Sequence, residues 1–177
     1  MNSDLVQKYM AELSGVINSP DMLKITELSR LLNEVKGLGS KVIIAGNGGS
    51  AGIASHVATD LSKTLQIRSL TFHDPALITC YANDYGYELW LKKAIESFAE
   101  KDDLIILISS SGKSPNMINA AKFSKEMGLK IVTLTGFNPE NPLRQMGDLN
   151  LWASSDKYNH IENTHQIWLL CALDLIT

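Results

Sequence analysis

The beginning of the chain repeats hydrophobic residues at helical spacing. Apolar side chains recur in this way over residues 6–17, and after the break at Ser19-Pro20 a second helical pattern runs from about residue 21 to residue 35. Polar residues occupy the positions between them. The pattern predicts two helices ahead of any strand.

From Lys41 onward, short apolar or β-branched runs alternate with helical stretches. Five runs have the length of strands: KVIIAG, IRSLTFH, DLIILISSS, KIVTLTG and LNLWAS. Helical patterns over residues 50–63 and 114–127 separate some of them. Residues 104–108 are apolar on both faces of a strand, which suits the interior of a parallel sheet covered by helices. We therefore predict an α/β fold, a three-layer α-β-α sandwich around a five-stranded, mainly parallel sheet with two N-terminal helices.

The last segment of the chain has a different pattern. Residues 167–176 are apolar nearly all the way round a helix, and only Asp174 interrupts them. In a protein that does not enter a membrane, such a helix is buried on most of its faces. A chain of this size has little room for it inside its own core, so we expect subunits of a homo-oligomer to meet there.

Composition and charge exclude several classes of protein. The 177 residues are 45% hydrophobic, which suits one domain with a sizeable core. The net charge is -3 and the basic residues are scattered, so we expect no nucleic-acid partner. No apolar run is long enough for a membrane span or a signal peptide. Cys80 and Cys171 lie in apolar surroundings without metal-site spacing, which predicts buried free thiols and a cytoplasmic location.

A glycine-rich turn follows the first predicted strand. GNGGS, residues 46–50, connects this strand to a helix, and the free backbone N–H groups and the dipole of a helix N-terminus favour a bound phosphate. The motif is neither a Walker A loop nor a complete dinucleotide fingerprint, so a nucleotide is not expected. By itself, the turn is equally well explained as a tight turn with Ser50 as the helix cap.

A second turn, ISSSGKSPN at residues 108–116, also connects an apolar strand to a helix. The carboxyl ends of parallel strands share one edge of the sheet, where open α/β folds bind their ligands. Ordinary helix capping accounts for some of its serines but not for a run of three plus one. We expect the serines to surround a phosphate without help from a basic residue.

Four titratable residues near these turns are candidates for chemistry. His56 and Asp60 are spaced i, i+4 and share one face of the helix that begins at the glycine turn. They are candidates for acid–base catalysis, for half of a metal site, or for a simple surface pair. Glu162 and His165 enter the otherwise apolar last helix, where a solvent-exposed first turn is the simpler explanation.

Together these motifs resemble the SIS (sugar isomerase) domain family, and within it the sedoheptulose 7-phosphate isomerases, also called phosphoheptose isomerases. The resemblance covers almost the whole chain: GNGGSA with the following His56, ANDYGY, SSSGKSPN, TLTG, and a last helix that opens with Glu and His. It implies a flavodoxin-like SIS domain over residues 1–177. Residues 1–38 would be a helical pair used in oligomer packing, and residues 39–177 the α/β core with its C-terminal helix. Tetramers are usual in the family.

In that family a proton moves between C1 and C2 of a phosphorylated sugar through an enediol, here from sedoheptulose 7-phosphate to D-glycero-D-manno-heptose 7-phosphate. The residues that the resemblance assigns to substrate binding are Asn47, Gly48, Gly49, Ser50, Asn83, Asp84, Ser109, Ser110, Ser111 and Ser114. Those that it assigns to catalysis are Asp60, Glu162 and His56. The resemblance leaves zinc open: no cofactor is required with certainty, and the same His56, Asp60 and Glu162 would be the ligands.

The chain departs from the family pattern at three positions. Asp60 stands where the family has Glu, Glu162 where it commonly has Gln, and Leu170 where its isomerases carry a His that acts as base or ligand. One hypothesis is an isomerase in which Asp60 and Glu162 form the acid–base pair. The alternative is a non-catalytic SIS domain that binds a phosphosugar or a protein partner and regulates another process. The missing histidine favours the alternative, whereas the intact phosphate and sugar positions favour the isomerase.

Overall fold

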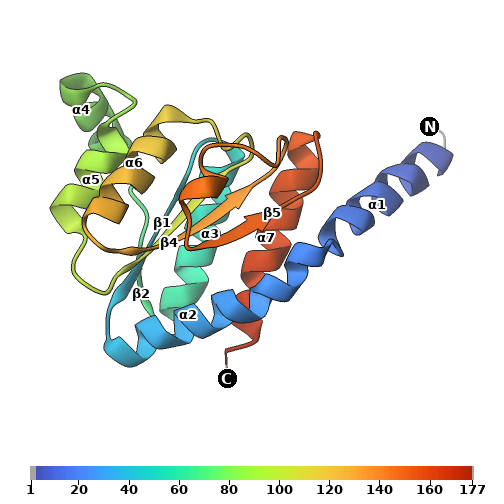
Figure 1. Cartoon of the computed structure of the whole chain (residues 1–177), viewed down its shortest axis with the longest axis horizontal. Coiled ribbons are helices and arrows are strands. Elements are labelled where there is room, and N and C mark those ends of the chain that lie inside the picture. Colours follow the sequence, from blue (N-terminus) through green and yellow to red (C-terminus); the bar gives the residue numbers. More distant parts are fainter. Residues whose placement is uncertain (1–2, 177) are drawn as a thin grey trace.

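The computed structural model describes residues 3–176, so residues 1, 2 and 177 of the predicted domain lie outside the described residues. Its middle layer is a five-stranded, all-parallel sheet in the order β2-β1-β3-β4-β5 (Figure 1). The strands are β1 (Lys41–Gly46), β2 (Arg68–Leu70), β3 (Leu104–Ser109), β4 (Lys130–Thr135) and β5 (Leu149–Trp152). The prediction of an α/β fold with a five-stranded sheet is confirmed.

Helices cover both faces of this sheet. They are α1 (Ser3–Ile17), α2 (Ile25–Leu38), α3 (Gly49–Lys63), α4 (Pro75–Tyr85), α5 (Trp90–Phe98), α6 (Pro115–Glu126) and α7 (Tyr158–Asp174), with short 3-10 helices at Pro20–Lys24 and Arg144–Met146. Successive residues of a strand point to opposite faces. Ile44 therefore packs with α2, α3 and α7, whereas Ile43 packs with α5 and α6, and the two apolar clusters define the three layers.

Two local predictions are wrong. The polar and glycine residues of YANDYGYE, residues 81–88, predict a polar turn, but residues 81–85 lie within α4. Asp74 caps this helix by accepting hydrogen bonds from the N–H groups of Ala76 and Leu77. The predicted second strand shortens to Arg68–Leu70, since only these residues pair with β1. The helix α5, which follows α4, was not predicted.

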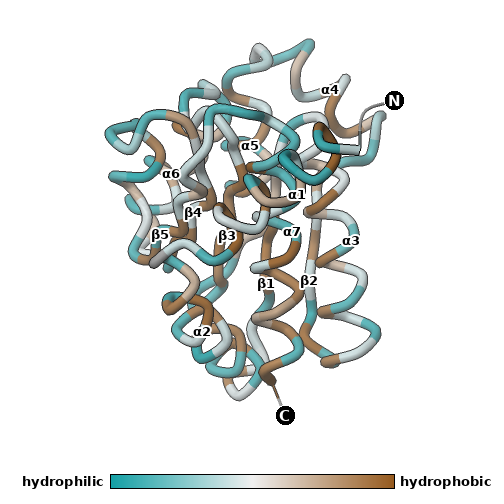
Figure 2. The backbone as a smooth tube through the Cα atoms, turned by 90° about the vertical axis from the view of Figure 1, so that its right-hand side faces the viewer, coloured by the Kyte–Doolittle hydropathy of each residue, from teal (hydrophilic) through white to brown (hydrophobic). Residues whose placement is uncertain are grey.

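The environment of the cysteines also differs from the prediction. Cys80 and Cys171 are free, as expected, but both are exposed in the chain. Cys80 lies on α4, which buries no residue fully, and Cys171 lies on the side of α7 that also exposes Ile167 and Leu175. Figure 2 shows the hydrophobic residues of α7 and β1 gathered in the middle of the molecule. α7 thus packs against α1, α2 and α3 on most of its faces, as predicted, and exposes one stripe of side chains.

The first helix, α1, extends away from the body of the molecule (Figure 1). Its C-terminal half is attached to α7: the Trp168 indole N–H donates to the carbonyl of Ile17 at 2.9 Å, and Tyr9 packs edge-on against His160. Its remaining apolar side chains are exposed, among them Leu5, Val6 and Met10. None of the helices in the described part of the chain has both the length and the apolar character needed to span a membrane.

Candidate functional site

Two strand-to-helix turns lie side by side at the carboxyl edge of the sheet. Residues of β1 and β3 are paired up to Gly46 and Ile108, so the glycine turn after β1 and the serine turn after β3 begin at the same level. The sequence predicted this juxtaposition, which follows from parallel pairing. Between the turns and the first residues of α7 lies a hollow of about 130 Å³.

The glycine turn depends on the absence of side chains. A Cβ at Gly46 would overlap the backbone of Ser50, and Gly48 adopts a positive φ of 56°. Glycine alone takes both positions without strain. The compact turn brings the first residues of α3 close to the end of β1, and it leaves Ser50 buried at the edge of the hollow.

The hollow is lined chiefly by hydroxyl groups. Its lining residues are Asn47, Ser50, Ile108, Ser109, Ser110, Ser111, Ser114, Tyr158 and Glu162. The Ser110 hydroxyl is buried without a hydrogen-bond partner among the described residues, and the Ser109 hydroxyl donates to that of Ser114 at 3.2 Å. A buried hydroxyl without a partner is costly in the absence of a ligand. The hollow therefore suits a ligand rich in hydrogen-bond acceptors.

A pair of carboxamides joins the two turns. Asn47 donates to Asn116 at 3.0 Å, and Asn116 donates back to the Asn47 oxygen at 2.9 Å. The same oxygen accepts a hydrogen bond from the Tyr87 hydroxyl at 3.2 Å. Asn47 does line the hollow, as predicted, but its carboxamide is engaged by the protein. Sequence reasoning missed Asn116 and Tyr87, although both lie in the quoted motifs.

A third loop supports the serine turn from behind. Gly112 has a φ of 62°, and a Cβ there would overlap the side chain of Asn141. Asn141 is fully buried: it donates to the Asn138 carbonyl at 2.8 Å and accepts from the Arg144 N–H at 2.9 Å. The Leu143 N–H donates to the Gly112 carbonyl at 3.1 Å. These contacts fix the serine turn in place.

Glu162 joins the hollow to the N-terminus of α3. Its carboxylate lies against Gly49, so close that a Cβ on Gly49 would overlap it. The N-terminus of a helix carries a partial positive charge that stabilises a carboxylate. Glu162 is the one charged residue among those that line the hollow. The structure thus brings this predicted residue together with the glycine turn and the serines.

His56 and Asp60 lie further along α3. The His56 Nε2 and Asp60 Oδ2 atoms are 3.3 Å apart, and the His56 Nδ1 atom is 3.3 Å from the side-chain nitrogen of Gln166 on α7. Asp60 follows Gly49 by eleven residues, a helical rise of about 16 Å. Within one chain, Asp60 and Glu162 therefore do not form the compact acid–base pair that the sequence suggested.

The three candidate metal ligands do not gather either. Across residues 3–176, no group of three or more His, Cys, Asp or Glu side chains is placed to hold a metal ion. Glu162 is held at Gly49, whereas His56 contacts Gln166. The residues present do not fit a zinc site made by a single chain, and the predicted set of His56, Asp60 and Glu162 is corrected in this respect.

Two further predicted residues lie apart from the hollow. Asn83 and Asp84 are in the last turn of α4, where Asn83 donates to Asp84 at 2.9 Å, and both are exposed. Neither lines the hollow, and Tyr87 from the same segment reaches the site instead. The predicted sugar contacts of Asn83 and Asp84 are not made within one chain around this hollow.

His165 is a structural residue. Its side chain is fully buried and its Nε2–H donates to the Thr135 carbonyl at 3.0 Å. Burial lowers the pKa of this imidazole to about 4, although the hydrogen bond to Thr135 opposes the shift. At neutral pH, His165 is therefore uncharged and links α7 to the end of β4.

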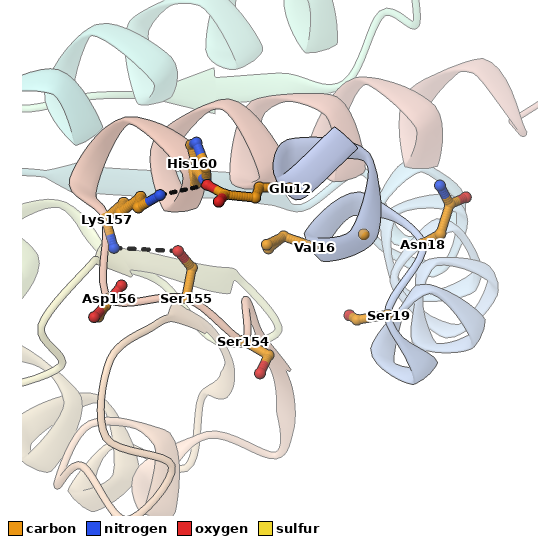
Figure 3. A pocket seen from close by; sticks show the side chains of 10 residues that line it. Glu12, Val16, Asn18, Ser19, Ser154, Ser155, Asp156, Lys157 and His160 are labelled. Carbon is orange, nitrogen blue, oxygen red and sulfur yellow. Dashed lines mark hydrogen bonds and ion pairs between the residues drawn. The ribbon is translucent and has the colours of Figure 1, made fainter. Parts of the chain in front are cut away.

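A second, more open cleft lies between α1 and the loop that precedes α7. Its volume is about 620 Å³, and Figure 3 shows Lys157 and Glu12 paired across it. The buried Ser19 hydroxyl and the Nε2 atom of His160 have no hydrogen-bond partner among the described residues. None of the residues predicted for the site lines this cleft.

Comparisons with known proteins agree with this architecture. A SIS domain family model matches residues 7–136. Phosphoheptose isomerase 1 of Campylobacter jejuni is 34% identical over 171 residues, covering 92% of this chain and 91% of that protein. The phosphoheptose isomerase of Helicobacter pylori strain P12 is 33% identical and covers 97% and 94%. A solved phosphoheptose isomerase structure from Francisella tularensis superposes with a TM-score of 0.86 at 25% identity, covering 98% of this chain and 97% of that one.

Proposed function

The chain belongs to the SIS domain family, among the phosphoheptose isomerases, and on that premise we propose that it interconverts a ketose phosphate and an aldose phosphate. Sedoheptulose 7-phosphate is the substrate we propose, through an enediol intermediate. The observation that carries the proposal is the hollow in which Ser109, Ser110 and Ser114 face a single carboxylate.

The serine turn supports phosphate binding. The unpartnered hydroxyl of Ser110 and its neighbours offer hydrogen-bond donors to phosphate oxygens. Phosphate is also favoured by the N-terminal ends of α3 and α6, which both begin at this edge of the sheet. The sugar chain would leave the hollow past Glu162, because this residue lines the hollow and contacts α3.

Glu162 is the residue that we propose as proton carrier between C1 and C2. Its carboxylate lines the hollow, where it would reach a bound ligand, and such reach is the first requirement of a general base. Asp60 and His56 lie further along α3, where they would meet the far end of an extended sugar. Catalysis by Glu162 would therefore place C1 and C2 at the hollow. Catalysis by Asp60 and His56 would place them further along α3.

The test is to incubate the purified protein with sedoheptulose 7-phosphate in deuterated water and to follow C1/C2 exchange and aldose formation by NMR. Exchange that is lost in Glu162→Gln and kept in Asp60→Asn assigns the base to the hollow. The opposite result moves the reaction to the far end of α3. Asn163→Leu on the exposed side of α7 is the control.

A non-catalytic role is the second candidate, and one observation favours it. The hollow contains one carboxylate and no histidine among its lining residues, so it has many groups for binding and few for proton transfer. A phosphosugar that raises the melting temperature without any C1/C2 exchange would support a binding and regulatory function over catalysis.

We also propose that the chain forms a homo-oligomer, a tetramer as is usual in the family. Exposed apolar side chains on α1 and on the outer side of α7 support this, since they offer surface for a second copy. We place the protein in the cytoplasm, where its two exposed thiols would stay reduced.

A further inference from the structure

His56 is held by two protein groups at the positions where a metal ion would have to bind. We infer that Asp60 and Gln166 together fix the proton of His56 on its Nε2 atom, so that the three side chains form a metal-free cluster. Gln166 is then a positioning residue. Its effect on catalysis, though not its contact with His56, rests on the proposed function. The protonation of His56 does not depend on that function.

The packing of α7 on α3 creates this arrangement. Glu162 and Gln166 are spaced i, i+4 and share one face of α7. Glu162 contacts Gly49 at the beginning of α3, and Gln166 meets His56 two turns further along. Both helices follow parallel strands and run in the same direction, so Glu162 and Gln166 meet successive parts of α3.

Charge determines which nitrogen of His56 carries the proton. The Asp60 carboxylate is negatively charged and has no proton to donate, so it favours the tautomer with the proton on the Nε2 atom, 3.3 Å away. In a neutral imidazole, Nδ1 is then an acceptor with a free lone pair. A carboxamide N–H of Gln166 is the donor that satisfies it, at 3.3 Å. The two contacts require the same tautomer.

This tautomer leaves His56 without a lone pair for a metal. Nε2 carries a proton, and the lone pair of Nδ1 accepts from Gln166. A metal ion would have to displace either the proton or the carboxamide. No third ligand compensates within residues 3–176, because no group of three metal-binding side chains exists there.

The tautomer is measured by long-range proton–nitrogen NMR on the full-length, 15N-labelled protein at about pH 8.5, where an ordinary imidazole is neutral. The His56 signals are assigned by their loss in His56→Gln. We expect a pyrrole-type Nε2 and a pyridine-type Nδ1 in the wild type and in Asn163→Leu. In Gln166→Leu we expect a larger share of the other tautomer, because Nδ1 loses its donor while Asp60 still favours the proton on Nε2. A mixture in the wild type, or an unchanged tautomer in Gln166→Leu, overturns the inference.

The metal is tested with zinc alone, by titration against a chromophoric chelator and in the same NMR spectra. We expect equimolar zinc to leave the His56 signals of the wild type unchanged. A zinc-dependent shift of both His56 nitrogens in the wild type overturns the inference. Neither measurement requires turnover, so an inactive protein that still shows the fixed tautomer contradicts the proposed isomerase and leaves the role of Gln166 intact.

Discussion

At the scale of single residues, Asn116 links the two halves of the site. Replacing it by leucine removes both hydrogen bonds to Asn47, each worth about 1 kcal/mol. We expect Asn116→Leu to weaken phosphosugar binding by up to about thirtyfold, since the two bonds are together worth about 2 kcal/mol and 1.4 kcal/mol corresponds to a factor of ten. Isothermal titration measures this. Asn119→Leu on the same helix is the control, and equal affinities in both variants would contradict the linking role.

Gly49 makes room for a carboxylate. An alanine there overlaps the flexible end of Glu162, which can move aside at little cost in stability. We expect Gly49→Ala to fold with nearly the wild-type melting temperature and to lose at least about tenfold in exchange rate, because a displaced base loses its orientation. Gly52→Ala in the same helix meets no atom and serves as the control. Unchanged exchange in Gly49→Ala would show that Glu162 does not act at the hollow.

The residues of the site were only partly predictable from the sequence. The glycine and serine turns were recognised because a run of small residues between a strand and a helix indicates a ligand-binding turn by itself. Residues of both turns line the hollow. The contacts of Glu162 with Gly49 and of Gln166 with His56 depend on how α7 packs against α3. Residues more than 100 positions apart in the chain carry no local signal of such contacts.

At the scale of elements, α7 is attached to the sheet through an uncharged histidine. The pKa of His165 is about 4 in the folded chain and about 6.5 when unfolded, so the unfolded state binds more protons between these values. Stability therefore falls as the pH drops from 6.5 toward 4, by up to about 3 kcal/mol for this group. Urea unfolding at several pH values measures the slope.

His165→Gln is the matched variant, because its carboxamide N–H can still donate to the Thr135 carbonyl without titrating. The difference in unfolding free energy between wild type and variant should shrink or reverse as the pH falls below about 6.5. A difference that stays constant from pH 7.5 to pH 4.5 would contradict a buried, neutral His165.

The helices and strands themselves were more predictable than the side-chain contacts, and the exceptions have physical reasons. The strands that pack on both faces were clear from their apolar runs, as at residues 104–108. α4 was missed because it has no fully buried apolar stripe: Leu77, Ile78, Tyr81 and Ala82 pack against the core only in part. α5 does have such a stripe, with Trp90, Leu91, Ala94 and Ile95 buried, and a helical interpretation of that segment was open from the sequence.

At the scale of the whole molecule, the apolar face of the outer half of α1 is not covered by any other described helix or strand. The helix is 15 residues long, about the length at which an isolated helix is marginal in water. Its outer half exposes Leu5, Val6 and Met10, whereas the α7 contact holds only its other end. A helix with an apolar face needs another apolar surface, and a second copy of this chain offers one on α1 and α7.

We therefore expect the double variant Val6→Glu/Met10→Glu to sediment as a monomer of 19.5 kDa, whereas the wild type sediments as a larger species. The control Gln7→Glu/Ala11→Glu adds the same charge to neighbouring exposed positions of α1 and should keep the oligomer. If the wild type is a monomer, or if both double variants dissociate equally, the apolar face is not the contact. If the monomer also loses phosphosugar exchange while the control keeps it, a second copy completes the site, which would account for the distance between Asp60 and Glu162 within one chain.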